Sequence, residues 1–537
     1  MRINIRSSLS VSFSALIAVT LLGSGLLHMS FPASVEGLER IEDGQRIYRQ
    51  GIRPSGDPIT AIVTGDVSVS GSQFSCHNCH GRSGMGTSEG SYQVLPIAGR
   101  FLFSDSIQPP RPAYDEQSFA RALRTGINPA GRKLDPLMPR YKFSDDEVTA
   151  LASYLQKLSS TPPPGVDDKV IRLATVITDE VDEHKRDAFL SVLQTYVDEK
   201  NRQTRLESLR WNRGKTPASK LPTLYREWML DIWNLKGPSS SWSKQLENRY
   251  KNNPVFAMMS GLNSGSWRPI GRFCERHNIP CLFPSTDLAD ADPTDFYTHY
   301  FSQGLDLEAS LIAEHLATHP ISQVVQIYCT EASEIAANNL RSTFLRKKMS
   351  VENHLFSCKD PLPLTKLKLQ EFDSLKTAVI LWLNREQLAR FKHVFPTQRL
   401  YLSSTLLERN LVNLPISTSK KTLIAHPYYL PGQPDSAMER FKVWARTRDI
   451  DIRYPRIQSE AFFACFATND ALYHVRRYLL RDYMLDSLDH AQGLAAYVPV
   501  HPRATIGPDQ RFLTKGGYLL ELLDGRTDTE NATWILP

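Results

Sequence analysis

The chain has no run of basic residues, no second close pair of cysteines, and no apolar segment beyond residue 31 long enough to span a membrane. Without a basic run, the net charge of +6 over 537 residues gives no indication of nucleic-acid binding. A structural zinc site uses four ligands, usually in two close pairs, so the lack of a second pair argues against zinc. No short-period repeat or low-complexity tract is present either.

The composition is that of a soluble globular protein, with 41% hydrophobic and 22% charged residues, and the length favours two or three domains. Arg2 and Arg6 precede an apolar run over residues 9–31, which is the layout of an export signal. That run approaches the ~20 residues that span a bilayer and shows no clean cleavage site. Residues 1–35 are therefore predicted to be a signal peptide or a retained N-terminal membrane anchor, and the remainder is predicted to lie in the periplasm.

A proline-rich segment, residues 161–168, separates two regions of unequal size. Its consecutive prolines and glycine predict a stiff linker. The smaller region, 36–160, is rich in Gly and Pro between two helical patterns, and the second helix opens on a capping box formed by Ser144 and Glu147. The larger region, 169–537, holds the rest of the chain.

The larger region alternates apolar strand patterns with amphipathic helix patterns. Strands are predicted at 170–178, 254–262, 279–285, 324–329 and 377–383, and helices at 183–201, 267–278, 309–319, 334–348 and 385–395. Continuous apolar strands between helices indicate parallel sheets with helices on both faces. The region is long enough for two such α/β lobes.

The motif with the most specific chemistry is Cys76-x-x-Cys79-His80, within "SQFSCHNCHGRSGMG". A close cysteine pair can be a redox dithiol, half of a zinc site, or the attachment point of a c-type haem. A dithiol is expected in a βαβ context, whereas this pair stands in a Ser- and Gly-rich loop. The adjacent histidine favours haem, because two thiols add to the haem vinyl groups and the histidine then lies beneath the iron.

The second axial ligand is predicted to be Met138, a thioether just before a proline, on the loop that leads into the last helix of the smaller region. Met85 stands too close to His80 to reach the opposite haem face, so it is expected to line the haem pocket at most. His77, between the two cysteines, is expected to be a solvent-exposed bystander.

Residues 36–160 resemble a class I cytochrome c domain. The resemblance rests on "CHNCHG", "LPIAGR", "ALRTGINPAGRKLDPLMPRY" and the closing helix. It implies a small all-α domain with one covalent haem c, in which Cys76 and Cys79 are thioether links and His80 and Met138 bind the iron. Two filled axial positions imply outer-sphere electron transfer rather than oxygen or peroxide chemistry.

A candidate ligand site lies where two predicted strands of the larger region end. The stretch "SGLNSGS" places Ser264, Gly265 and Ser266 between a strand and a helix, and "NIPCLFPST" ends the next strand at Ser285 and Thr286. Backbone N–H groups at the start of a helix suit a carboxylate or another anion. The alternative is a turn in which Ser264 or Ser266 caps the helix.

Residues 169–537 resemble the type I periplasmic binding proteins, most of all the branched-chain amino-acid receptors of ABC transporters. The resemblance implies two α/β lobes joined by a hinge that close on a small ligand such as an amino acid, with the five residues above in the ligand loops. Ser302 stands where the family usually has an arginine, and the glycine-rich opening after the first strand is missing. The ligand is therefore not identified by the resemblance.

The cysteines outside the motif are predicted to be structural. Cys274 and Cys281 are either a local disulfide or two buried thiols, since disulfides form in an oxidising compartment. Cys329 and Cys358 are a further candidate pair. Cys465 lies in an apolar stretch and is predicted to be a buried free thiol.

These predictions lead to three functional hypotheses. The leading one is an electron carrier, not an enzyme, that serves a periplasmic dehydrogenase or a terminal acceptor while the larger domain docks a partner or a small ligand. The alternative is a small-metabolite binding or sensing protein whose haem reports, or is gated by, redox state. The third is a haem enzyme, and an iron ligated by Met138 argues against it.

Overall fold

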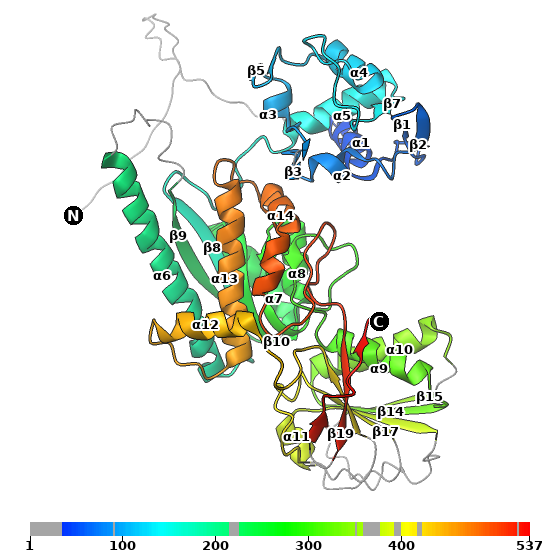
Figure 1. The fold of residues 1–537 in the computed structure, drawn as a ribbon, viewed down its shortest axis with the longest axis vertical. Helices are drawn as coiled ribbons and strands as arrows, with labels where there is room; N and C mark the ends of the chain where they lie inside the picture. Colours follow the sequence, from blue (N-terminus) through cyan, green and yellow to red (C-terminus); the bar gives the residue numbers. More distant parts are fainter. Residues whose placement is uncertain are drawn as a thin grey trace, which may run out of the picture.

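The fold is that of a computed structural model of the chain. It describes residues 35–537 except 90–91, 214–224, 350–351, 358–375, 391–398, 416–421 and 524–525. Three bodies follow one another along the long axis: the first region (residues 35–160), lobe 1 and lobe 2 (Figure 1). Among the described residues no helix is both long and apolar enough to cross a membrane. The predicted export segment lies outside them up to residue 34.

The first region is a small helical body with short strands at its edges. Its helices are α1 (Val35–Gln50), α2 (Cys76–His80), α3 (Gly99–Leu102), α4 (Glu116–Thr125) and α5 (Asp145–Lys157), and its strands are β1 (Thr60–Val63), β2 (Val67–Ser70), β3 (Ser88–Glu89), β4 (Tyr92–Gln93), β5 (Ser106–Ile107), β6 (Pro110–Arg111) and β7 (Arg140–Tyr141). Helix α1 packs against α5, and both contribute to one apolar core. The predicted capping box of α5 is confirmed: Ser144 and Glu147 each accept a hydrogen bond from the other's backbone N–H.

The all-α prediction for this region is wrong in part. Strands β2, β1 and β7 form an antiparallel three-stranded sheet. Strands β1 and β2 are joined by a turn with positive φ at Gly65 and Asp66, the backbone that favours tight hairpins. The "VSVS" sequence of β2 alternates apolar and polar residues, which suits a strand with one face in solvent.

Lobe 1 is a parallel sheet in the order β13-β11-β10-β8-β9, with β12 beside β10. Its strands are β8 (Val170–Thr178), β9 (Glu227–Leu235), β10 (Ala257–Ser266), β11 (Cys281–Leu282), β12 (Ser285–Leu288) and β13 (Thr298–His299), and its helices are α6 (Glu183–Arg213), α7 (Trp242–Asn252), α8 (Arg268–His277), α12 (Ser436–Arg446), α13 (Pro455–Val475) and α14 (Arg481–Asp489). Strand β8 is apolar along most of its length because helices cover both faces of a parallel sheet.

Lobe 2 is a second sheet in the order β15-β14-β16-β17-β18-β19-β20, with β21 beside β19. Its strands are β14 (Gln323–Tyr328), β15 (Glu352–Ser357), β16 (Thr377–Trp382), β17 (Arg399–Ser403), β18 (Thr422–His426), β19 (Gly517–Leu523), β20 (Arg526–Asp528) and β21 (Trp534–Ile535), and its helices are α9 (Leu305–Ala317), α10 (Glu331–Arg346) and α11 (Arg385–Arg390). The strands are parallel up to β18, and β19 to β21 add antiparallel pairs.

The chain crosses between the lobes after β13, after β18 and before β19. Helices α12, α13 and α14 lie between β18 and β19 in sequence, yet they pack in lobe 1, where α13 contacts α6 and β10 (Figure 1). The prediction of two α/β lobes is confirmed. Segments that connect the lobes therefore border the cleft between them.

Two details differ from the predictions. Strand β10 continues to Ser266, through the predicted turn, because Leu262 and Asn263 pair with β12. The proline-rich linker is also not a free spacer where it meets lobe 1. Gly165 has φ +88 and no room for a Cβ against Phe256, and its carbonyl accepts a hydrogen bond from Arg172 N at 2.8 Å. The end of the linker is thus packed on lobe 1.

Candidate functional site

The Cys-x-x-Cys-His motif forms helix α2 on its own. Cys76 and His80 are buried, whereas Cys79 is exposed. Residues three and four apart in a helix share a face, so Cys76, Cys79 and His80 lie on one side of α2. The helix ends at Gly81, whose φ of 73° is a backbone conformation that glycine adopts readily. Both thiols are free and are not joined to each other.

His80 is oriented by a single backbone group. Its Nδ1 lies 2.9 Å from the carbonyl oxygen of Leu95. A carbonyl can only accept, so Nδ1 carries the hydrogen and the lone pair of the ring stands on Nε2. Burial lowers the pKa of His80 to about 4, against the opposing effect of that hydrogen bond, so the imidazole is neutral at pH 7. A neutral, oriented imidazole is the form that binds a metal.

The other groups around the motif suit a haem better than zinc or a redox dithiol. Met138 and Cys76 belong to the same apolar cluster of the first region. In the part of the chain that the structure describes, no three His, Cys, Asp or Glu side chains come together as a metal site, so a zinc ion would lack ligands. The strands that precede α2 are an antiparallel hairpin rather than a βαβ unit. The donor set of two thiols, one imidazole and one thioether fits a haem c.

Two residues, His77 within the motif and Met85 just after it, face lobe 1. The prediction that His77 is solvent-exposed is wrong: its side chain is half-buried, and charges of the larger region, including Asp489 and Asp509, act on it. Burial lowers the pKa of His77. Met85 packs with Ala98 and with Leu480 of lobe 1.

The five predicted ligand residues of the larger region do lie together. Ser264, Gly265 and Ser266 end β10, and Ser285 and Thr286 begin β12, its neighbour in the sheet. The hydroxyl of Thr286 donates to the Gly265 carbonyl at 3.1 Å. Ser264 is exposed, whereas Ser285 is almost completely buried.

The start of helix α8 is served by the protein's own groups. The hydroxyl of Ser266 accepts from Arg268 N at 3.2 Å and donates to Asp290 Oδ2 at 2.7 Å. Arg268 Nη2 lies 2.6 Å from Asp290 Oδ1. Ser266 thus satisfies the first backbone N–H of α8, although the residue at the N-cap position is Trp267. The Asp290 carboxylate binds the side chains of Ser266 and Arg268, and the binding of a ligand anion at this loop stays a prediction.

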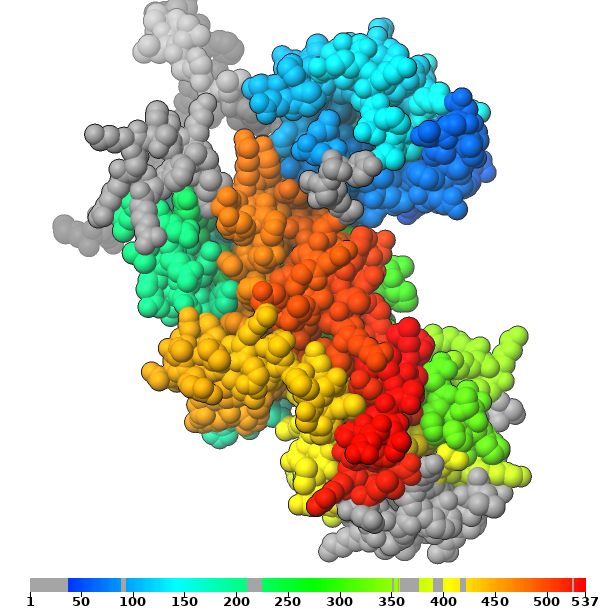
Figure 2. Space-filling view, in the orientation of Figure 1, coloured from blue at the N-terminus to red at the C-terminus, as the bar shows by residue number. Residues whose placement is uncertain are grey.

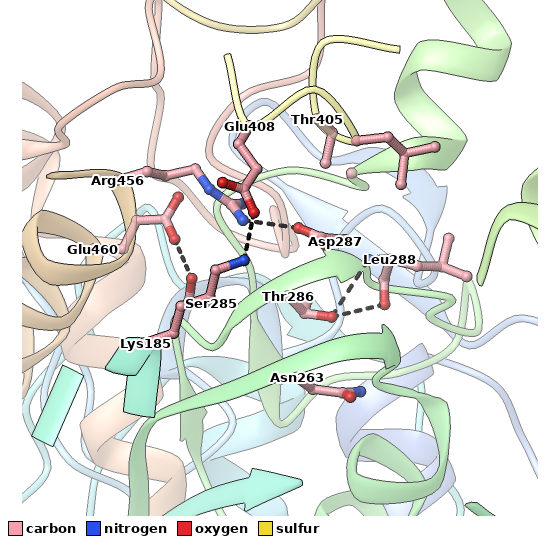
Figure 3. A network of polar contacts seen from close by, with 12 residues as sticks. Lys185, Asn263, Ser285, Thr286, Asp287, Leu288, Thr405, Glu408, Arg456 and Glu460 are labelled. Carbon is pink, nitrogen blue, oxygen red and sulfur yellow. Dashed lines mark hydrogen bonds and ion pairs between the residues drawn. The ribbon is translucent and has the colours of Figure 1, made fainter. Parts of the chain in front are cut away.

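A second set of polar residues, which the sequence patterns did not indicate, surrounds Ser285 (Figure 3). Its hydroxyl donates to Glu460 Oε2 on α13, and Glu460 Oε1 lies 3.2 Å from His501 Nε2. One turn before Glu460, Arg456 Nη2 lies 2.8 Å from Asp287 Oδ1. Arg456, Glu460 and Asp287 are brought together by α13 crossing the end of β12.

The charges of this cluster depend on one another. Burial raises the pKa of Asp287, and this outweighs the opposing effect of Arg456. Burial acts on Glu460 in the same direction, but Arg456, His501 and Ser285 together hold its pKa below the ordinary value. Arg456, mostly buried, is therefore the cation that balances two carboxylates.

Lobe 2 contributes an acidic group to the same cleft. Glu308 Oε1 accepts from Thr405 N at 3.0 Å and from Thr405 Oγ1 at 2.8 Å, and Thr405 Oγ1 also lies 2.8 Å from the hydroxyl of Tyr428. Burial raises the pKa of Glu308 to about 7. Across the cleft Lys185 of α6 forms an ion pair with Glu408 of lobe 2 (Figure 3). Both lobes thus meet through polar side chains.

Several buried atoms of this cleft have no hydrogen-bond partner among the described residues. They are Glu308 Oε2, Arg409 Nε, His426 Nδ1 and His501 Nδ1. Tyr428 lies among three of these residues: its ring is edge-on to His426 and tilted against His501, and the Arg409 guanidinium lies 5.3 Å from its ring centroid. Leaving such atoms unpaired is costly, so water or a polar ligand is expected to supply their partners.

A cavity of about 500 Å³ lies elsewhere, between α9, α10 and residues 512–515. None of the five predicted ligand residues lines it. The polar cleft and the cavity are therefore different places, and the four buried atoms named above belong to the cleft.

The remaining cysteine predictions have mixed outcomes. Cys274 and Cys281 are two buried thiols rather than a disulfide, and Cys274 Sγ instead lies 3.5 Å from Met258 Sδ. Cys465 is confirmed as a buried free thiol. Cys329 is disulfide-bonded, and Cys358, its predicted partner, lies outside the described residues.

No protein-family model and no curated protein sequence matches the chain. Solved structures are similar in fold. One is a branched-chain amino-acid ABC transporter protein from Thermus thermophilus with bound valine, at 9% identity and TM-score 0.49, covering 68% of this chain and 97% of that chain. Another is a branched-chain amino-acid substrate-binding protein from Streptococcus pneumoniae with isoleucine, at 11% identity and TM-score 0.46, covering 69% and 100%.

A third is a solute-binding protein from Rhodopseudomonas palustris with 3,4-dihydroxybenzoic acid, at 11% identity and TM-score 0.47, covering 67% of this chain and 95% of that chain. Identities and TM-scores this low say nothing about the ligand of this chain. None of the three is described as a cytochrome, so the electron-carrier hypothesis gains no support from them. The support for the predicted haem site comes from the Cys-x-x-Cys-His motif and the geometry around it.

Proposed function

We propose that the chain is an exported binding protein for a small polar molecule, and that its first region carries one covalent haem. The observation that carries the first part is the cleft between the lobes, where Glu460 and Glu308 are buried, Arg456 is mostly buried, and several polar atoms have no partner among the described residues. Buried polar atoms of that kind are what a bound ligand satisfies.

The charges of the cleft suggest the class of ligand. Arg409 and Arg456 supply guanidinium groups, which prefer carboxylates, and Glu308 and Asp287 supply acceptors for an ammonium or hydroxyl group. A small molecule with a carboxylate at one end and a donor at the other, such as an amino acid, fits this division. Lys185 and Glu408 pair across the lobes and would stabilise the closed form.

For the haem, Cys76 and Cys79 would be the thioether links and His80 and Met138 the axial ligands. The orientation of His80 by Leu95 and the shared core of Cys76 and Met138 support this assignment. The group would supply one-electron redox chemistry. In the binding protein that we propose, the haem would report redox state or respond to closure of the lobes.

A second function is favoured by the exposure of Cys79. A haem linked there would have an edge near the surface, and the exposed Leu137 beside Met138 adds an apolar contact. That arrangement suits electron transfer to or from a partner protein such as a periplasmic dehydrogenase or a terminal acceptor. Under this proposal the larger domain would dock the partner or hold a small ligand.

A thermal-shift series tests the binding proposal. The full chain is heated with each of a panel of amino acids and small carboxylic acids, since a ligand that binds only the folded state raises the unfolding temperature. At least one compound is expected to stabilise the protein, and Glu308→Gln is expected to weaken that stabilisation. Ser240→Ala, a change at an exposed hydroxyl outside the predicted ligand residues, serves as the control and should leave the shift in place. No shift with any compound would contradict ligand binding and favour the docking function.

A further inference from the structure

Helix α14 of lobe 1 lies against the segment that follows the haem motif. Figure 2 shows the first region resting on the surface that residues near 480 form. The contact is polar: Asp486 on α14 accepts hydrogen bonds from Arg82 N at 3.1 Å and from Ser83 N at 2.9 Å. These residues are separated by some 400 positions in sequence. Asp486 is 6% exposed, so the first region and lobe 1 together enclose it.

Gly81 makes this close approach possible. It is the residue next to His80, and a Cβ on it would come within 2.7 Å of Asp486 Oδ2. Its φ of +73° is also a conformation that other residues rarely adopt. The carboxylate therefore sits against the backbone that directly continues from the proximal histidine. Tyr48 holds the same glycine from the other side, donating its hydroxyl to the Gly81 carbonyl at 2.7 Å.

A second carboxylate of α14 extends the contact. Asp482 accepts from the hydroxyl of Tyr297 at 2.7 Å and lies 3.7 Å from Arg82 Nε and 3.8 Å from Arg49 Nη2. The Arg82 guanidinium also covers the ring of Phe296 at 3.7 Å. Asp482 is thus the charged neighbour of Asp486 on its own helix, and Arg82 and Arg49 of the first region pair with Asp482.

Helix α14 is itself fixed to the sheet of lobe 1. Arg481 is buried at the start of the helix and donates to the carbonyls of Val255 and Phe256, which lead into β10. It also donates to Pro164 in the linker at 3.3 Å. Helix α14 and strand β10 would therefore move together, and the end of β10 carries three of the predicted ligand residues.

We propose that Asp486 is a positioning residue for the haem-binding segment, through which lobe 1 sets the orientation and the electrostatic surroundings of His80. The inference rests on the proposed haem at Cys76, Cys79 and His80. The oxidised iron carries one more positive charge than the reduced iron, so a buried carboxylate at this place favours the oxidised form. Lobe 1 is in this sense part of the haem site.

The test compares Asp486→Asn with Asp145→Asn in the full chain. Both changes remove one negative charge, but Asp145 is on α5, is 90% exposed and pairs with Arg124 across the surface. The ratio of reduced to oxidised haem is measured at fixed ambient potentials set by redox mediators. We expect Asp486→Asn to raise that ratio about tenfold, equivalent to ~59 mV for a one-electron couple, and Asp145→Asn to leave it within about twofold.

Hydrogen exchange of the Arg82 and Ser83 amides is the second measurement. It reports the hydrogen bonds of these amides to Asp486 even if the reduction potential of the haem does not respond to the change. Faster exchange at these two amides in Asp486→Asn supports the inference. A reduced-to-oxidised ratio and amide exchange both equal to those of Asp145→Asn overturn it while leaving the haem assignment intact. Absence of covalent haem from the unaltered chain overturns the proposed haem site, and the inference with it.

Discussion

Replacing Arg456 by methionine removes the cation that balances Asp287 and Glu460 while keeping a side chain of similar length. The guanidinium lies 2.8 Å from Asp287, its side chain is 18% exposed, and Glu460 is 1% exposed. Breaking a buried ion pair by deleting one partner typically costs 3–5 kcal/mol, because the other charge stays buried without compensation. Because Arg456 and Asp287 are partly exposed, we expect Arg456→Met to lower the free energy of unfolding by about 3 kcal/mol at pH 7.

Urea unfolding at pH 7 measures this loss through the midpoint and the slope of the transition. Part of the lost stability should return as the pH is lowered towards 5, since protonation removes the uncompensated carboxylate charges. The double variant Arg456→Met, Asp287→Asn should be more stable than Arg456→Met alone for the same reason.

Arg453→Met is the matched control. It lies just before the start of α13, is well exposed, and pairs with the exposed Asp451, so its loss should change stability by no more than about 0.5 kcal/mol. Equal stabilities of Arg453→Met and Arg456→Met would mean that Arg456 contributes no more to stability than an exposed surface charge does, contrary to this prediction.

Two further changes probe the cleft and the iron ligands. Glu308 has its pKa raised from 4.5 to about 7 by burial, so the folded state binds more protons than the unfolded state and stability falls as pH rises from about 4.5 to 7. The decline amounts to about 3 kcal/mol at 1.36 kcal/mol per pKa unit, and Glu308→Gln should abolish it. Urea unfolding repeated across that pH range measures the free energy of unfolding, and an unchanged dependence of this free energy on pH would contradict the prediction. Met138→Ala should abolish the long-wavelength absorption of methionine-ligated haem iron, whereas Met85→Ala should keep it; retention of that band in Met138→Ala would disprove the ligand assignment.

The local parts of the structure were predictable from the sequence. The capping box at Ser144 joins residues three apart in sequence, so the sequence shows both partners. The continuous apolar run of β8 indicates directly that both faces of the strand are buried. The hairpin of β1 and β2 is also a local pattern, but a cytochrome-like reading of the region as all-α overlooked it.

The clusters that join distant segments were not predictable. Ser285 was found because it ends a strand, but its partner Glu460 lies 175 residues further on and looks like one more polar position on a helix. Asp486 meets Ser83 across 403 residues. No spacing in one sequence encodes such pairs, because only the packing of α13 and α14 on lobe 1 creates them.

The predicted turn at Ser266 illustrates a different limit. Its small residues fit both a ligand loop and a strand end with a helix cap, and the choice depends on Asp290, which lies 24 residues away in sequence. The Asp290 carboxylate bonds the side chains of Ser266 and Arg268 beside the predicted ligand loop.

Covalent attachment of haem to this chain is the property that most directly tests the proposed haem site. The full chain is exported in a host that assembles c-type cytochromes, denatured, extracted with acidified acetone, and assayed for haem that stays with the polypeptide. We expect one haem per chain, lost when Cys76 and Cys79 are both replaced by alanine. Haem that is absent, or that the solvent extracts completely, would contradict it.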